Sequence, residues 1–586
     1  MKRYISIPIL LGFLCCWSCE DDFLERYPLD EISPQDYFNN AYELKLFANS
    51  FYLLLPVHQM YYGGTFYTDQ NSDNLVPPVA DKRLTGIRTV PSTGGGWDWN
   101  DIREANFFLD HVAEFMDTIN ESSIYIAEVK FFKAYLYYEK LKTFGDVPWF
   151  NRALDTDSPE LFAPRDRRDV VVDSMISCLD WAITHLLSRD KSEPFRVNKE
   201  TALLLKARIC LYEGTWEKYH KDTPFGVPGK DGTDFLEMAA EAAETLMTMG
   251  TVDLYKGPAG AEYWSLFNQL NYDVNPEVVL WKKYDVGLGV FHKVGQYLPN
   301  SGGDMGITKS IVDDYLCTDG KPISVSPLFM GYDSIELEAQ NRDPRLAQSI
   351  FLPGDPRTIN TPSGVKEIYF SKPPIDQAGQ NRAITGYCLY KGVNPEYTQQ
   401  QPSGGWMASI IFRYSEALLI YAEAKAELGT LTQNDIDISV NLLRDRVGMI
   451  PMDLGNIAVD PDWDFPNLSP IINEIRRERR IELAFEASRW DDLARWRAHH
   501  LIENIRPRGI KYIGSNLEGT YLKPDGSGLP SIIVGENLYV DGEGYIDPYQ
   551  VQVPAGFGFD PGRDYLAPIP SDELTLNSNL VQNPGW

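Results

Sequence analysis

Positive charge is scarce in this sequence. Across 586 residues, 54 Lys and Arg stand against 83 Asp and Glu, which gives a formal net charge of −29. A chain this acidic repels phosphate backbones and anionic lipid surfaces. The composition therefore argues against nucleic acid as a partner. Any membrane contact has to come from something other than a basic patch.

Cysteine pairs and catalytic motifs are missing from the body of the chain. No CxxC pair occurs after residue 19, which argues against a zinc ribbon or a thioredoxin-like motif. Cys178 and Cys210 fall in segments with helical patterns and are predicted to be buried as small apolar side chains. There is no GxSxG elbow, residues 226–231 (GVPGKD) lack the pattern of a phosphate loop, and His499-His500 has no HExxH frame. The sequence thus indicates no cofactor, no metal site and no enzyme active site.

A row of carboxylates is the strongest apparent exception. Glu474, Glu478, Glu482 and Glu486 recur every four residues, and such a row is able to bind a metal or to act as an acid/base pair. Arginines are interleaved with them at positions 476, 477, 479, 480, 489 and 495. The favoured interpretation is an ion-pair network that joins this helix to its neighbours.

Apolar runs long enough to span a membrane are also missing. Residues 5–17 form an apolar stretch of 13 residues after Lys2 and Arg3. A span needs ~20 residues, whereas this length suits a signal peptide. We expect residues 1–18 to be a lipoprotein signal peptide and Cys19 to be the lipidated first residue of the mature chain, with Cys16 as the alternative.

Residues 19–38 are expected to form a lipidated linker. The acidic residues at 20–22 resemble the surface-export signal of lipoproteins in glycan-using Gram-negative bacteria; the alternative is a merely solvated linker. Stable attachment through acyl chains takes more than one chain. The expected location is the cell surface, with the protein lipid-anchored in an outer membrane.

The remaining pattern predicts a mainly α fold. Apolar residues recur at spacings of three and four in 122–144, 169–187, 199–212 and 234–249, with glycines at 145, 214 and 250 as expected stops. Residues 39–254 are therefore predicted to be helix pairs of tetratricopeptide type. Residues 255–407 are rich in Gly, Pro, Asn and Asp, which indicates a loop-rich region with short strands. Helical patterns return within 408–586, at 414–428, 435–447 and 470–498.

Six motifs in order and spacing carry a family resemblance. They read CEDDFLERYPLDEISPQDYF (19–38), EVKFFKAYLYYEKLKTFGDVP (128–148), NRDPRL (341–346), FRYSEALLIYAEA (412–424), RRIELAFEASRWDDLARW (479–496) and YLAPIPSDELTLNSNLVQNPGW (565–586). Over nearly the whole mature chain the sequence resembles the SusD/RagB family of outer-membrane nutrient-binding lipoproteins. The resemblance implies four tetratricopeptide-like helix pairs with a loop-rich ligand-binding part. It also implies a lid-like role over a SusC-like TonB-dependent transporter, no enzyme activity, and oligosaccharide or sometimes peptide ligands.

A glycine-rich loop is the first candidate for the ligand site. Residues 94–100 read GGGWDWN, just before an expected helix. In an extended loop Trp97 and Trp99 would point to opposite sides. A bend at the glycines would instead bring both to one cleft, where indole faces stack on sugars while Asp98 and Asn100 bond hydroxyls. In starch-binding members of the family a Trp/Asn loop at about this position contacts glycan. The alternative is that one or both tryptophans pack against the first repeat.

Two further candidates are weaker. The polar segment 67–74 (YTDQNSDN) includes Asp69 and Asp73, which we expect either to bond sugar hydroxyls or to lie in a solvated turn. Tyr297, near a Gly-Gly turn, is the third candidate. The hypothesis from the sequence is a surface lipoprotein that captures glycan for a transporter. A peptide or glycoprotein receptor of the same fold and a surface glycan hydrolase are the alternatives.

Overall fold

The computed structural model describes residues 38–586 except 39, 60–64, 113–121, 301–304 and 403. The expected signal peptide, Cys19 and nearly all of the linker lie outside the described residues. The α-helices are α3 (Ala41–Ser50), α4 (Asn100–Val112), α5 (Ser122–Phe144), α6 (Arg168–His185), α7 (Lys199–Tyr219), α8 (Thr233–Thr248), α9 (Val294–Tyr297), α10 (Lys309–Asp314), α11 (Ile335–Ala339), α12 (Pro344–Ala347), α13 (Tyr414–Glu427), α14 (Gln433–Asp437), α15 (Val440–Arg446), α16 (Pro470–Glu482), α17 (Arg489–Arg495) and α18 (Ser571–Leu576).

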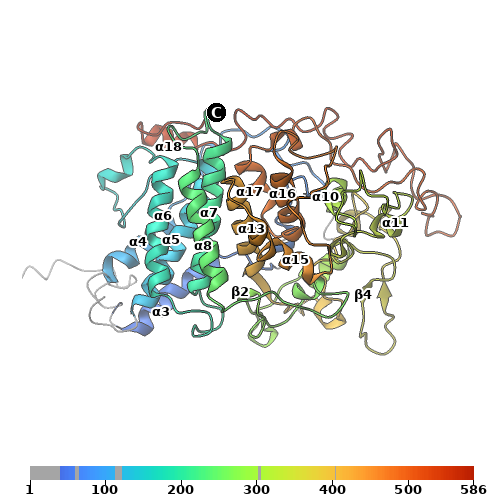
Figure 1. Ribbon diagram of the computed structural model, residues 1–586, viewed down its shortest axis with the longest axis horizontal. Helices are drawn as coiled ribbons and strands as arrows, with labels where there is room; N and C mark the ends of the chain where they lie inside the picture. The colour runs from blue at the N-terminus through green and yellow to red at the C-terminus, as the bar shows by residue number, and fades with distance from the viewer. Residues whose placement is uncertain (1–37, 39, 60–64, 113–121, 301–304, 403) are drawn as a thin grey trace, which may run out of the picture.

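The long helices form a layered array. Helices α4 to α8 stand side by side in chain order, and α13 then packs on α8 and α16 on α13 (Figure 1). The other end of the molecule is loop-rich. Within the described residues there are three two-stranded antiparallel sheets: β1 (Leu75–Val76) with β3 (Gly306–Ile307), β2 (Val278–Lys282) with β6 (Ser409–Arg413), and β4 (Pro356–Thr358) with β5 (Ile368–Tyr369). The β2–β6 sheet lies against α7 and α13, and β4–β5 lies at the loop-rich end (Figure 1). The predicted mainly α fold with short strands is confirmed. In the described part of the chain, no helix is both long enough and apolar enough to cross a membrane.

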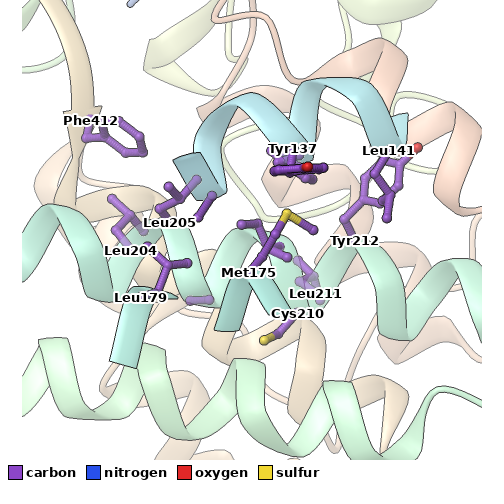
Figure 2. Close-up of a cluster of buried hydrophobic side chains, with 14 of the residues drawn as sticks. Tyr137, Leu141, Met175, Leu179, Leu204, Leu205, Cys210, Leu211, Tyr212 and Phe412 are labelled. Atoms are coloured by element: carbon purple, nitrogen blue, oxygen red, sulfur yellow. The ribbon is translucent and has the colours of Figure 1, made fainter. Parts of the chain in front are cut away.

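Apolar side chains at helical spacing hold the array together. Figure 2 shows Tyr137 of α5, Met175 of α6 and Leu211 of α7 facing one another, while Phe412 of β6 lies nearer Leu204 and Leu205 of α7. Each such side chain stabilises the fold by about 1.5–3 kcal/mol when it leaves water. Cys210 lies in the same core, is a free thiol, and burial raises its pKa to about 12. Its predicted role as a small apolar side chain is confirmed, as is that of the buried Cys178.

The predicted end of α7 at Gly214 is wrong, because the helix continues to Tyr219. Gly214 lies where the next helix begins: a Cβ there would approach Leu236 of α8 to 2.8 Å and the carbonyl oxygen of Gly232 to 3.0 Å. The glycine therefore serves close packing between α7 and α8 rather than helix termination.

The single helix predicted over 470–498 is also wrong, because it is broken between α16 and α17. Phe485 and Ala487 have φ values of +65° and +68°, in the left-handed region. The carboxylate of Asp69 accepts hydrogen bonds from the backbone N–H of Phe485 at 2.7 Å and of Arg489 at 3.3 Å. This distant partner stabilises a break that helical periodicity conceals. The segment predicted as one helix at 435–447 is likewise divided, into α14 and α15.

The carboxylate row of α16 is confirmed as an ion-pair network. Glu474 and Glu478 pair with Arg444 of α15, and Glu482 pairs with arginines 345, 413 and 446. The arginines of α16 reach carboxylates of α13 and α17 and Asp314 of α10 in the same way. Among the described residues, no group of three or more His, Cys, Asp or Glu side chains is placed to hold a metal ion.

The lowered pKa values of two buried histidines make the stability of the fold depend on pH. The Nε2 atoms of His220 and His292 lie 2.8 Å and 2.9 Å from the carbonyl oxygens of Ala494 and Met407. Burial lowers the pKa of His220 to about 3 and that of His292 to about 4. Because both stay neutral in the folded state while the unfolded chain protonates near pH 6.5, stability falls as the pH drops below that value.

We therefore expect each histidine to cost about 2 kcal/mol of unfolding free energy at pH 5 relative to pH 7. His220→Gln keeps a donor for Ala494 but cannot titrate. Urea unfolding at both pH values should show that this variant loses about 2 kcal/mol less than wild type on acidification. An equal loss in both proteins would contradict the assignment.

Candidate functional site

Two hollows lie near the residues singled out in the sequence. The tryptophan groove is bordered by residues 97–106, 148–163 and 573–580 and encloses about 380 Å³. The central cavity encloses about 420 Å³ and is bordered by residues 56–83 as far as they are described, 135–142, 208–212, 267, 408–416 and 479–495. Both volumes fall in the range of small-molecule sites.

The glycine run bends the chain into the tryptophan groove. Gly94, Gly95 and Gly96 all have positive φ, between 60° and 89°, which other residues rarely adopt. The carboxylate of Asp98 then accepts a hydrogen bond from the backbone N–H of Asn100 at 3.0 Å, at the start of α4. Asp98 and Asn100 are both exposed. The bend expected at the glycines is therefore present, and it turns both tryptophans toward α5.

The two tryptophans differ in burial. Trp97 is 8% exposed and packs edge-on against Phe144 of α5, with ring centroids 4.9 Å apart. Trp99 is half-buried, meets Trp97 edge-on at 5.2 Å and Phe150 at 5.5 Å, and has the Lys140 ammonium 5.6 Å from its ring centroid. Trp97 thus belongs mainly to the core, and Trp99 is the indole that retains accessible surface in the groove.

The groove combines apolar surface with polar groups. Leu161, Phe162 and Leu576 of α18 are 42%, 54% and 70% exposed around it. Asn106 contributes an amide that donates to the carbonyls of Phe150 and Arg152, while its buried oxygen accepts no bond from the described residues. Such a surface suits a ligand with apolar faces and hydrogen-bonding edges.

Asp69 and Asp73, predicted either to bond sugar hydroxyls or to lie in a solvated turn, are not among the described residues that line either hollow. Asp69 is 1% exposed, and burial raises its pKa to about 6. Asp73 forms ion pairs with Arg489 at 2.6 Å and Arg480 at 3.0 Å. Burial alone would raise the pKa of Asp73, but the two guanidinium groups lower it to about 2. Both carboxylates instead fix the segment between α16 and α17.

Other residues of the same polar loop do reach a hollow. Thr68, Gln70 and Asn71 line the central cavity. Tyr297 is half-buried in α9 and is not among the described residues that line either hollow. The tryptophan loop therefore borders the tryptophan groove, and part of the polar loop borders the central cavity.

The sequence did not indicate the main side chains of the central cavity. Arg83 and Trp490 lie against each other there, 4.2 Å from guanidinium carbon to ring centroid, although 407 positions separate them in the chain. Tyr135 and Tyr138 of α5 add aromatic surface. Tyr135 and Tyr138 follow Phe131 by four and seven positions and share its side of α5, so helical periodicity gave no signal that they would border a cavity.

An array of helix pairs with a loop-rich half and surface hollows defines a class of helical binding proteins. The model of the SusD family matches residues 270–586, more than half of the chain, and this chain therefore belongs to the SusD family. The resemblance seen in the six motifs is confirmed.

Individual relatives agree with this assignment. SusD-like protein P2 of Formosa agariphila is 23% identical over 603 residues, covering 100% of both chains. A SusD-like carbohydrate binding protein of Bacteroides fragilis superposes with a TM-score of 0.69 at 21% identity, covering 93% of this chain and 100% of that one. A structure described with xylogluco-oligosaccharide has a TM-score of 0.58 at 16% identity, covering 92% of this chain and 97% of that one. At these identities the solved structures establish the fold.

Proposed function

We propose that this protein is a cell-surface lipoprotein that binds an oligosaccharide or polysaccharide and delivers it to a SusC-like TonB-dependent outer-membrane transporter. Membership of the SusD family supports the proposal, as do relatives described as carbohydrate binding or as holding xylogluco-oligosaccharide. The observation that carries it is the tryptophan groove, where the accessible indole of Trp99 lies beside Phe150 and hydrogen-bonding side chains.

The recognition chemistry follows from the nature of sugars. A pyranose presents C–H groups on its face and hydroxyls at its rim. The face packs on the accessible part of Trp99, and the rim meets Asn100, Arg103 and Arg152. Arg103 is held by the carbonyl of Leu154, and Arg152 by Glu160, so both guanidinium groups are already oriented. Preorganised groups lose less entropy on binding.

Delivery requires that the protein stay beside its transporter. In this proposal the acyl chains on Cys19 tether the mature chain, and residues 20–38 link the anchor to the rest of the protein. A hinged movement of the protein over the transporter mouth then transfers the glycan. No chemical step is needed, so the proposed protein is not an enzyme and uses no cofactor.

A surface glycan hydrolase is the less favoured alternative. Glycosidases that use two carboxylates need them on either side of the scissile bond, about 5–9.5 Å apart. Of the described residues that line the tryptophan groove, only Glu573 carries a carboxylate. This composition favours binding over hydrolysis.

A peptide or glycoprotein receptor of the same fold is the second candidate. The exposed side chains of Leu161, Phe162 and Leu576 favour it, because apolar side chains of this kind anchor peptides in grooves. Calorimetry of the full-length protein against a polysaccharide panel and against a peptide library separates the two. Binding to peptides alone would replace the glycan proposal.

Trp99→Ala tests the groove directly. We expect glycan affinity to fall by about 1–3 kcal/mol, because the stacking surface is lost while the fold is retained. Trp181→Ala is the matched control: Trp181 is also half-buried, but it stacks on His185 of α6 at 3.8 Å, away from the groove. Calorimetry with the tightest polysaccharide of the panel measures both variants. Unchanged affinity in Trp99→Ala would remove the groove from the proposal.

A further inference from the structure

The charges that line the central cavity are balanced and almost fully paired. Six cations and six anions line it, counted over the described residues. Ten of these twelve side chains form ion pairs with one another, for example Lys142 with Asp491 at 2.9 Å and Arg208 with Glu416 at 2.6 Å. Within the described part of the chain, Arg83 and Asp81 are the two charged lining residues without an ion pair.

Arg83 presents an oriented but unused donor set. Its guanidinium carbon lies over the ring of Trp490, 4.2 Å from the centroid, and its buried Nε has no hydrogen-bond partner among the described residues. Arg479 adds a second buried donor to the same lining, because its Nη1 also lacks a described partner. Leaving a buried donor unsatisfied costs about 1–3 kcal/mol, so these groups favour a ligand or solvent oxygen in the cavity.

Asp81 supplies the complementary acceptor. Its Oδ1 accepts the backbone N–H groups of Arg83 at 2.8 Å and of Leu84 at 3.2 Å, which fixes the turn that carries both charged side chains. Its other oxygen accepts no hydrogen bond from the described residues. A fixed donor and a fixed acceptor two residues apart therefore border one space.

The lining segment that carries Trp490 includes two residues in a strained backbone conformation. Ala487 lines the cavity with φ +68°, and Phe485 beside it has φ +65°. Asp69 bonds the N–H of Phe485, and Asp73 pairs with Arg489 just beyond. Left-handed non-glycine residues cost about 1–3 kcal/mol each and tend to occur at binding and catalytic sites. Aromatic side chains, among them Phe66, complete the lining.

We propose that the central cavity is a second sugar-binding site, which takes one neutral saccharide unit through a vicinal pair of hydroxyls. One hydroxyl accepts from the guanidinium of Arg83 and its neighbour donates to the carboxylate of Asp81. A hydroxyl both donates and accepts, which matches this pair. An anionic sugar would meet Asp81, and a cationic one would meet Arg83, so the balanced lining selects a neutral unit. The cavity volume of about 420 Å³ lies in the range of small-molecule sites and accommodates one saccharide unit. This inference rests on the proposed function only in taking a glycan as the ligand.

The test uses saturation-transfer-difference NMR on the full-length protein in detergent. The probes are the methyl glycosides of glucose, galactose, mannose, xylose and arabinose, with glucuronic acid and glucosamine as charged comparisons. We expect at least one neutral glycoside to bind wild type more tightly than both charged sugars. Arg83→Leu should weaken its binding by about tenfold or more, since a bonded charged donor is lost.

Two variants separate recognition from folding. Arg83→Lys keeps the charge but lacks the planar fork, and it should weaken binding less than Arg83→Leu. Asp81→Asn keeps an acceptor oxygen for the turn and should weaken binding while the thermal unfolding midpoint stays within a few degrees of wild type, as expected for a change of under ~1 kcal/mol.

The outcomes distinguish this inference from the proposed function. Trp99→Ala should leave binding of the neutral glycoside unchanged, because that residue lines the other hollow. If no neutral glycoside binds wild type, or if Arg83→Leu binds as wild type does, the second site is rejected. Oligosaccharide binding that still depends on Trp99 would leave the proposed function standing in either case. Preferential binding of glucuronic acid or glucosamine would also overturn the neutral-sugar assignment.

Discussion

Glu482→Gln is expected to lower the free energy of unfolding by about 3–5 kcal/mol, because it leaves buried guanidinium groups without their counter-charge. Glu482 is completely buried at the end of α16. Its carboxylate lies 3.0 Å from Arg345, 2.8 Å from Arg413 and 2.7 Å from Arg446, and therefore joins three segments far apart in the chain. Burial alone would raise the pKa of Glu482, but these arginines hold it well below its usual range.

A matched substitution at the surface gives the control. Glu193 pairs with Lys45 at 2.6 Å, but its side chain is 59% exposed, so Glu193→Gln should cost less than about 1 kcal/mol. Urea unfolding of wild type and both variants, followed by circular dichroism at pH 7, measures the difference. If the two glutamine variants lost equal stability, the network would contribute no more than a surface pair.

Lowering the pH should weaken the stabilisation that the same ion-pair network provides. Because the pKa of Glu482 is lower in the folded state than in the unfolded chain, its contribution is present above the unfolded pKa near 4.5 and declines below it. The buried histidines act in the window just above, from pH 6.5 downward. The two effects therefore add in sequence as the pH falls.

Local patterns were sufficient to place the long helices but not to predict every helix end and break, and they were insufficient for the sites. The apolar spacing predicted α5 with its observed ends, Ser122 and Phe144, because packing follows the helical period there. Interleaved Glu and Arg predicted the network of α16, because opposite charges buried together have to pair. These inferences need only residues within one element, the tendency of apolar side chains to be buried, and the tendency of buried opposite charges to pair.

What the sequence did not predict depends on contacts between distant segments. The break after α16 is stabilised by Asp69, 416 positions earlier, and no local pattern encodes that partner. The same is true of Arg83 on Trp490. Within the tryptophan loop, the bend at the glycines was foreseen, but which indole would be buried was not, since that depends on Phe144 and Phe150 of another segment.

Cys19→Ser is expected to release the protein completely from the outer-membrane fraction, because the proposed anchor is the acylated thiol at this position. Each buried methylene of an acyl chain contributes about 0.8 kcal/mol, so losing two or more chains removes far more binding energy than any single surface contact supplies. Cys16→Ser is the matched control, since Cys16 is the alternative acceptor and lies three residues away.

Labelling cells with a radioactive fatty acid, then separating membranes and probing intact cells with protease, measures acylation, anchoring and surface exposure together. We expect the Cys16 variant to remain labelled, pelleted and protease-accessible, and the Cys19 variant to be unlabelled and in the supernatant. The reverse pattern would move the anchor to Cys16 and keep the lipoprotein proposal, whereas labelling of neither wild type nor variants would leave the proposed delivery to a transporter without its tether.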